Sequence, residues 1–209
     1  MNYHSLSKYF LEVVLLLSMT GLIDPPLVIG QDVGEQAYAF TLPAASGETI
    51  SLAQYQGQYV VLEWMNLRCR EVDRLYKNND LPRLQSQLKE KGVVWLSVIS
   101  EAEGKRGQVP LDRLSRQLEK RGGNQDDVLI DVTGEVGYAF GALKAPHLVL
   151  INPAGLVIYQ GALDNQPTGE SVDGPAINYV VAALDQSMNG DEVQYATTEA
   201  YGCPIRYDR

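Results

Sequence analysis

Five mainly apolar stretches of the chain predict β-strands, and the first two have the continuous apolar pattern of strands that are covered on both faces. The five are Tyr59–Trp64, Val93–Ile99, Val128–Asp131, His147–Ile151 and Leu156–Tyr159. Residues 34–52 alternate loosely between apolar and polar positions and turn at Pro43–Gly47, which predicts a short N-terminal β-hairpin. Asn152–Gly155, with the sequence NPAG, predicts a hairpin turn between the last two strands.

Other stretches carry apolar residues three and four positions apart, the spacing of an amphipathic helix. The first begins after Cys69, with Val72 and Leu75 on one stripe. Asn78–Asp80 interrupts it, and Pro82 then stands where the first turn of a second helix tolerates proline. Further stripes predict helices near residues 111–118, 134–140 and 177–188.

The predicted order is a β-hairpin, then strand, helix, strand, helix and strand, then a second hairpin and a last helix. Strands that alternate with helices indicate a central sheet with parallel members and helices on both faces. The hairpin near the end adds antiparallel strands. The sequence therefore predicts an α/β fold with a mixed central sheet.

Composition limits the number of domains and the kinds of partner. The chain has 209 residues, of which 45% are hydrophobic, enough for one domain with a sizeable core. Its formal net charge is −9. An acidic chain repels nucleic acid and anionic lipid, so we expect neither as a partner.

The first thirty residues differ from the rest. Residues 13–23 (VVLLLSMTGLI) are mainly apolar, Asp24-Pro25-Pro26 ends the run, and Gly30 closes a stretch of small or compact residues. This order predicts a secretory signal at residues 1–30, cleaved after Gly30, and export to the periplasm or another extracytoplasmic space. The run is shorter than the roughly 20 residues of a membrane-spanning helix. The alternative is an amphipathic N-terminal arm of a cytoplasmic protein.

Cys69 stands where the predicted strand passes into the predicted helix, between Arg68 and Arg70. A thiol reacts as its thiolate, and a reference pKa of about 8.5 leaves little thiolate at neutral pH. The positive end of a helix dipole and two guanidinium groups both stabilise an anion. Glu71 and Asp73 act in the opposite direction. Cys69 is therefore either a redox-active nucleophile or an inert, buried cysteine.

The element order, with a cysteine at the end of the first central strand, resembles the redoxin, or peroxiredoxin-like (AhpC/TSA-type), branch of the thioredoxin-like superfamily. The resemblance spans residues 33–207. The stretches that carry it are Val33-Gly34, Phe40–Leu42, VVLEW at 60–64, KGVVWLSVIS at 91–100, Ala145-Pro146-His147, NPAGLVIYQGALD at 152–164, NYVVAALD at 178–185 and GCPIR at 202–206.

The resemblance implies a thioredoxin-like domain over residues 31–209 and a partner site around the cysteine. Ala145, Pro146 and His147 match the loop in which such folds place a cis proline beside the reactive sulfur. This chain departs from the usual motif, because Arg70 follows Cys69 where relatives carry proline, and Val72 occupies the place of a second cysteine. Leu62 and Asn66 stand where peroxiredoxins have proline and threonine.

Cys203, in the C-terminal Gly-Cys-Pro, is the only other cysteine. It is either a resolving cysteine for Cys69, forming a reversible disulfide during turnover, or one half of a permanent disulfide that fixes the tail. Both interpretations require the two sulfur atoms to lie close together, and we expect that they do.

Other chemistry finds little support in the sequence. His147 is either an acid or base near the cysteine or a packed side chain. The cysteines and histidines lack the short spacings of a metal site, so we expect neither a metal nor another cofactor.

The leading hypothesis is an exported thiol–disulfide oxidoreductase that acts on a protein thiol or disulfide, or on a peroxide, through catalytic Cys69 and Cys203. Arg68, Arg70, Ala145, Pro146 and His147 would form its partner site. The alternative is a non-catalytic module with a structural Cys69–Cys203 disulfide that binds a partner protein. The sequence leaves the oligomeric state open.

Overall fold

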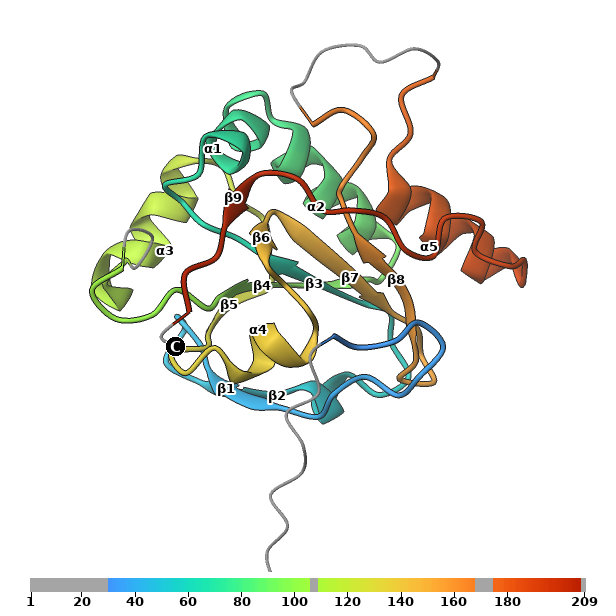
Figure 1. Ribbon diagram of the computed structural model, residues 1–209, viewed down its shortest axis with the longest axis horizontal. Coiled ribbons are helices and arrows are strands. Elements are labelled where there is room, and N and C mark those ends of the chain that lie inside the picture. The colour runs from blue at the N-terminus through green and yellow to red at the C-terminus, as the bar shows by residue number, and fades with distance from the viewer. Residues whose placement is uncertain (1–29, 106–108, 168–174, 208–209) are drawn as a thin grey trace, which may run out of the picture.

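A five-stranded mixed sheet forms the centre of the protein (Figure 1). The computed structural model describes residues 30–105, 109–167 and 175–207. The strands lie in the order β5-β4-β3-β7-β8. They are β3 (Val60–Trp64), β4 (Val94–Ile99), β5 (Asp127–Ile130), β7 (His147–Ile151) and β8 (Val157–Gly161). Strands β3, β4 and β5 are parallel, and β7 and β8 run antiparallel to their neighbours, which confirms the predicted mixed sheet.

The apolar runs in the sequence correspond to strands covered on both faces. Every residue of β3 and of β7 is buried. The edge strand β8 instead alternates between buried and half-buried residues. The central strands β3 and β7 are therefore buried throughout, whereas the edge strand β8 keeps a period of two.

Helices lie on both faces of the sheet, as predicted (Figure 1). They are α1 (Arg70–Lys77), α2 (Asp80–Glu90), α3 (Leu111–Lys120), α4 (Glu135–Ala139) and α5 (Tyr179–Asn189). Two consecutive residues of β3 show the two faces. Glu63 meets Gln85 of α2 on one side, and Trp64 packs against Phe140, at the end of α4, on the other.

The break between α1 and α2 forms at the predicted asparagines. Asn79 has a φ of 63°, in the left-handed region that asparagine tolerates better than most residues. Pro82 follows in the first turn of α2, where a missing N–H costs no helical hydrogen bond. One helical pattern in the sequence thus becomes two helices that change direction.

The predicted N-terminal hairpin is present. It consists of β1 (Thr41–Pro43) and β2 (Thr49–Ser51), paired antiparallel, and a 3-10 helix (Leu52–Tyr55) follows it. An isolated bridge between Ala44 and Leu129 joins the hairpin to β5. Through this bridge the hairpin packs beside β5, and its buried residues Leu42 and Ala44 join the hydrophobic core.

A second small sheet was not predicted. It pairs β6 (Lys144–Ala145) with β9 (Cys203–Pro204), and Figure 1 shows the tail that carries β9 crossing the molecule past β6. Strands of two residues are too short to show a periodic pattern in the sequence. This pairing brings the second cysteine to the site described below.

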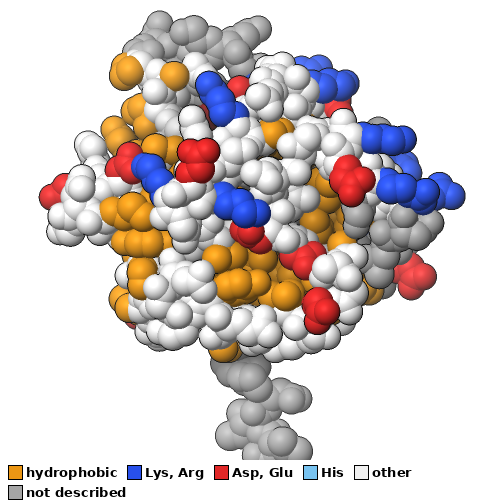
Figure 2. Space-filling view, turned by 180° about the vertical axis from the view of Figure 1, so that it is seen from behind, with side chains coloured by type: hydrophobic (Ala, Val, Ile, Leu, Met, Phe, Trp, Pro, Cys, Tyr) orange, Lys and Arg blue, Asp and Glu red, His pale blue; other side chains and the backbone are white. Residues whose placement is uncertain are grey.

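The surface mixes both signs of charge. Figure 2 shows Lys and Arg side chains close to Asp and Glu side chains on the face behind that of Figure 1, with hydrophobic side chains between them. Exposed ion pairs include Lys89–Asp126 and Lys91–Asp185, and such pairs contribute little individually. In the part of the chain that the structure describes, no helix has the length and hydrophobicity to cross a bilayer. The signal predicted at residues 1–30 lies outside the described residues, Gly30 excepted.

Candidate redox site

Cys69 occupies the N-cap of α1. Its backbone is extended, with φ −81° and ψ 131°, and its carbonyl accepts the hydrogen bond of Asp73 N–H that closes the first helical turn. Its own N–H donates to the carbonyl of Asn66 and so fixes the turn that leads out of β3. The sequence placed this cysteine correctly at a strand-to-helix joint, where the helix dipole favours an anion.

Cys69 and Cys203 form a disulfide, with their Cα atoms 5.7 Å apart although the two residues are separated by 134 positions in the chain. The expected contact between the two sulfurs is therefore confirmed. Cys69 is buried, with 1% of its surface exposed, whereas Cys203 is only partly buried. The tail that carries Cys203 therefore covers Cys69.

The tail reaches Cys69 as an added strand. Ala145 of β6 pairs with Cys203 of β9, and Ile205 N–H donates to the carbonyl of Leu143. The Ala145–Pro146 peptide bond is cis, which confirms the expectation from the resemblance. The carbonyl oxygen of Ala145 lies 3.4 Å from Cys69 Sγ. The loop that holds Pro146 thus contacts both Cys69 Sγ and the strand that carries Cys203.

Gly202 allows this close approach. Its φ is +104°, and a Cβ placed on it would lie 2.2 Å from the Ala145 carbonyl oxygen. A side chain cannot be accommodated there without moving backbone atoms. The residue before Cys203 therefore has to be glycine for the tail to lie flat on β6.

Further contacts hold the tail beyond the disulfide. Ala102 N–H donates to the carbonyl of Arg206, and Arg206 N–H donates to the carboxylate of Glu101. The hydroxyl of Tyr207 donates to the carbonyl of Ala142, and burial raises the pKa of that hydroxyl, so it stays a neutral donor. Before Cys203, the hydroxyl of Tyr201 donates to the carboxylate of Asp164 at 2.8 Å, so hydrogen bonds hold the tail on both sides of Cys203.

Glu71 lies directly against the disulfide. Its Oε2 is 3.0 Å from Cys69 Sγ and 3.2 Å from Cys203 Sγ. In the disulfide these sulfurs carry no hydrogen, but in the reduced protein either thiol would have a proton acceptor at this distance. The sequence did not single out Glu71 for this role. Its only signal was an acidic residue two positions after the cysteine.

Arg68 and Arg70 flank the cysteine on the surface. Both are exposed, and among the described residues neither forms an ion pair. The structure gives no contact between either guanidinium and a sulfur atom. Their predicted effect on the thiolate would therefore act through solvent, and it stays a prediction.

His147 is buried next to Pro146. Its ring meets Trp64 edge-on, with centroids 5.9 Å apart, and its Nε2 has no hydrogen-bond partner within the described part of the chain. Burial lowers its pKa to about 4, because the protonated ring would lose its hydration. The imidazole is therefore neutral at pH 7 and packed in the core.

Glu63 is a second acidic residue for which the sequence predicted no role. Its side chain is buried under α2, and its Oε2 accepts hydrogen bonds from Trp95, Ser97 and Gln85. Burial raises its pKa, and those hydrogen bonds offset only part of the rise. The sequence signal for this buried carboxyl group was a single acidic residue in an otherwise apolar strand.

The model of the AhpC/TSA family matches residues 33–160. This match covers more than half of the chain. The protein belongs to the AhpC/TSA family. The matched region includes Cys69 and Pro146 but ends before Cys203, so the tail cysteine is a feature of this chain outside the part that defines its membership.

Solved structures of similar fold agree with this assignment. A hypothetical protein from Sinorhizobium meliloti is 21% identical, with a TM-score of 0.74 over 86% of this chain and 96% of its own. An uncharacterized conserved protein from Geobacillus kaustophilus is 23% identical, with a TM-score of 0.75 over 85% and 93%. A thiol-disulfide oxidoreductase from Bacteroides fragilis is 18% identical, with a TM-score of 0.51 over 75% and 98%. These likenesses support the thioredoxin-like fold. No curated protein matches the chain.

The AhpC/TSA fold brings one set of possible metal donors together among the described residues. Cys69, Glu71 and Cys203 place their donor atoms within 4.8 Å of one another. Metal ions bind thiolates, and in this state the two sulfurs are bonded to each other. With both sulfurs in a disulfide the cluster offers no thiolate, and we assign no metal to it.

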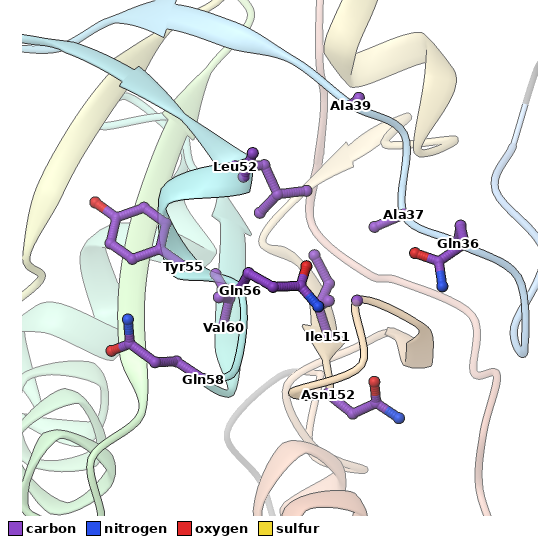
Figure 3. A pocket seen from close by; sticks show the side chains of 12 residues that line it. Gln36, Ala37, Ala39, Leu52, Tyr55, Gln56, Gln58, Val60, Ile151 and Asn152 are labelled. Atoms are coloured by element: carbon purple, nitrogen blue, oxygen red, sulfur yellow. The ribbon is translucent and has the colours of Figure 1, made fainter.

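A small pocket lies away from this centre (Figure 3). It has a volume of about 160 Å³ and is lined by Val60 and Ile151, at the end of the sheet opposite the disulfide. Figure 3 shows Gln36, Gln56 and Asn152 around it. It contains no thiol or titratable cluster and adds nothing to the chemistry of Cys69.

Proposed function

We propose that this AhpC/TSA-family protein is a thiol–disulfide oxidoreductase in which Cys69 is the nucleophile and Cys203 the resolving cysteine. The observation that carries the proposal is the disulfide itself. It joins the N-cap of a helix to the short tail strand β9, beside a cis proline. The helix end provides the stabilisation that a thiolate nucleophile or leaving group requires.

The exchange has two steps. In the first, the reduced Cys69 thiolate attacks a partner disulfide, forms a mixed disulfide and releases one partner sulfur as a thiolate. In the second, Cys203 attacks Cys69 Sγ, so the Cys69–Cys203 bond forms and the second partner sulfur leaves. Cys69 and Cys203 are oxidised by two electrons and the partner is reduced. An external dithiol returns the protein to its reduced form.

A protein disulfide is the substrate class we propose. In the oxidised protein the tail pairs with β6 as an extended strand, and an extended partner segment would use the same backbone groups. Leu143, just before β6, has 55% of its surface exposed and offers an apolar contact beside this edge. A peroxide is the weaker candidate, because Leu62 and Asn66 replace the proline and threonine of the peroxiredoxin pattern.

A second candidate is a non-catalytic module. The burial of Cys69 and the hydrogen bonds on both sides of Cys203 also suit a permanent disulfide that fixes the tail. The exposed edge near Leu143 would then bind a partner without exchanging electrons with it. This candidate requires a disulfide that stays closed in the folded protein.

The experiment compares the wild type with Cys69→Ser, Cys203→Ser and the double variant, using dithiothreitol as the electron source. Reduction of a protein disulfide and consumption of hydrogen peroxide are measured in parallel. We expect Cys69→Ser to abolish disulfide reduction, and Cys203→Ser to accumulate a mixed disulfide at Cys69. If the double variant retains the full wild-type rate in both assays, the oxidoreductase proposal is wrong.

We also propose that the protein acts outside the cytoplasm. The apolar run at residues 13–23 and a disulfide between the only two cysteines both suit an oxidising compartment. N-terminal sequencing of the mature protein from its native host tests this. We expect a new N-terminus near Gln31, whereas an intact Met1 in the cytoplasmic fraction would contradict export.

A further inference from the structure

We propose that Glu71 carries the proton in the exchange between Cys69 and Cys203, an inference that rests on the proposed function. A single carboxylate oxygen, Glu71 Oε2, lies 3.0 Å from Cys69 Sγ and 3.2 Å from Cys203 Sγ. Among the residues the structure describes, no other acidic side chain is within hydrogen-bond distance of either sulfur. One group therefore serves both reacting atoms.

The two sulfurs differ in their need for a base. Cys69 caps a helix, so the helix dipole stabilises its thiolate. Cys203 lies in the short strand β9 and has no helix end to stabilise its anion. A free thiol with a pKa of about 8.5 is only a few per cent ionised at pH 7. Cys203 therefore needs a proton acceptor within reach when it attacks.

In the proposed step, Cys203 attacks Cys69 Sγ while Glu71 accepts one proton. The Cys203 thiol gives its proton to Glu71 Oε2, and the sulfur electron pair forms the bond to Cys69 Sγ. The bond between Cys69 Sγ and the partner sulfur breaks, and the partner leaves as a thiolate. That thiolate takes the proton from Glu71, directly or through water. The net reaction converts the mixed disulfide and the Cys203 thiol into the Cys69–Cys203 disulfide and a partner thiol.

The surrounding charges do not explain the position of Glu71. Asp73, the other acidic residue in the first turn of α1, pairs with Lys77 at 2.6 Å and Arg121 at 3.5 Å. Glu71 has no such ion pair within the described residues, and its carboxylate contacts sulfur instead. The other charged or titratable groups on the segments that meet here include Arg68, Arg70, Arg74, Tyr76, Glu101, Lys144, His147, Glu199, Tyr201, Arg206 and Tyr207.

The test follows ring closure in a single turnover of the full-length reduced protein with excess 5,5′-dithiobis(2-nitrobenzoate) from pH 5.5 to 9. Mixed-disulfide formation at Cys69 releases one thionitrobenzoate, and attack by Cys203 releases the second. Cys203→Ser, which can release only the first, assigns the phases. Glu71→Gln is the test variant. Asp73→Asn is the matched control, since it removes the same charge from the same helical turn without touching sulfur.

We expect Glu71→Gln to slow the second phase at least tenfold at pH 6–7, a threshold set below the roughly 10²–10⁴-fold that is typical of general acid–base catalysis. The difference should shrink above about pH 8.5, where Cys203 ionises unaided. Asp73→Asn should stay within about twofold of the wild type. Glu71→Asp, which keeps the carboxylate but withdraws it by one methylene, should retain the wild-type pH profile with a smaller loss.

The opposite result would overturn the inference. If Glu71→Gln closes as fast as the wild type or faster at pH 6–7, the carboxylate only repels a thiolate. That failure is distinct from failure of the proposed function, in which the wild type itself would show no second phase. Circular dichroism of each variant confirms that the helix remains folded.

Discussion

At the scale of single residues, two buried titratable groups act on stability in opposite directions. Burial raises the pKa of Glu63, so the folded state holds a proton that the unfolded chain releases above about pH 4.5, and stability falls as pH rises. Burial lowers the pKa of His147, so the unfolded chain binds a proton that the folded state rejects, and stability falls as pH drops. The contribution of each group to the pH dependence of stability can be measured by replacing one of the two side chains.

Replacing His147 tests the second contribution. The folded pKa is about 4 against an ordinary value of 6.5. The wild type should therefore lose up to about 3 kcal/mol between pH 6.5 and pH 4 through this residue. His147→Leu should lose correspondingly less over the same interval, as measured by urea unfolding. Between pH 7 and 8, where the imidazole is neutral in both states, the two proteins should show the same slope. An identical slope at pH 4–6.5 would contradict the burial of a neutral ring.

At the scale of elements, the pairing of β6 with β9 decides whether the second sulfur reaches the first. Among the described residues, this two-residue ladder is the one strand pairing that involves Cys203, and Gly202 before it allows the close approach. Helix α1 supplies the other half of the site by presenting Cys69 at its N-terminus. The disulfide thus joins the N-terminus of one helix to one short strand.

Gly202→Ala tests the strand. The added Cβ would clash with the Ala145 carbonyl, and alanine disfavours a φ of +104°. We expect a cost of about 1–3 kcal/mol in docking the tail. The Cys69–Cys203 disulfide should therefore become roughly tenfold or more easier to reduce in a dithiothreitol titration. Gly190→Ala is the matched control, because Gly190 also has a positive φ, of 79°, but nothing within 4 Å of its Cβ position. If both variants shifted the reduction of the disulfide equally, the clash between residue 202 and the Ala145 carbonyl would not be the cause.

At the scale of the whole molecule, the disulfide closes a very long loop. Cys69 and Cys203 are 134 positions apart, and the chain-entropy model gives about 5 kcal/mol of stabilisation for such a loop. Beyond Cys203 the tail continues to the loop after β4, where Arg206 N–H donates to Glu101. The disulfide therefore joins the start of α1 to a segment that also contacts another part of the fold. Oxidation state should therefore change global stability.

Reduction of the protein tests this. We expect the free energy of unfolding in urea to fall by several kcal/mol when dithiothreitol is added, with 5 kcal/mol as the upper end. Cys203→Ser should match the reduced wild type and should not respond to dithiothreitol. Equal stability of the oxidised and reduced wild type would mean that the disulfide does not constrain the unfolded chain.

Sequence patterns predicted those parts of the fold that depend on many residues in a row. The runs that became β3 and β4, and the break at Asn79, were correct because continuous burial and turn chemistry leave local signals. The pairing of β6 with β9 left no signal, since two residues show no period. The roles of Glu63 and Glu71 depend on what lies opposite them in space, and a single sequence does not state that.

The most direct measurement of the central claim is the native reduction potential of the Cys69–Cys203 pair. Folded, oxidised protein is equilibrated in dithiothreitol redox buffers without denaturant, alkylated and weighed by mass spectrometry. We predict a reversible two-electron transition between about −120 and −270 mV, the range of disulfide oxidoreductases, with the sheet intact throughout. A disulfide that stays closed below about −300 mV, or opens only when the protein unfolds, would identify a structural bond and contradict the proposed redox function.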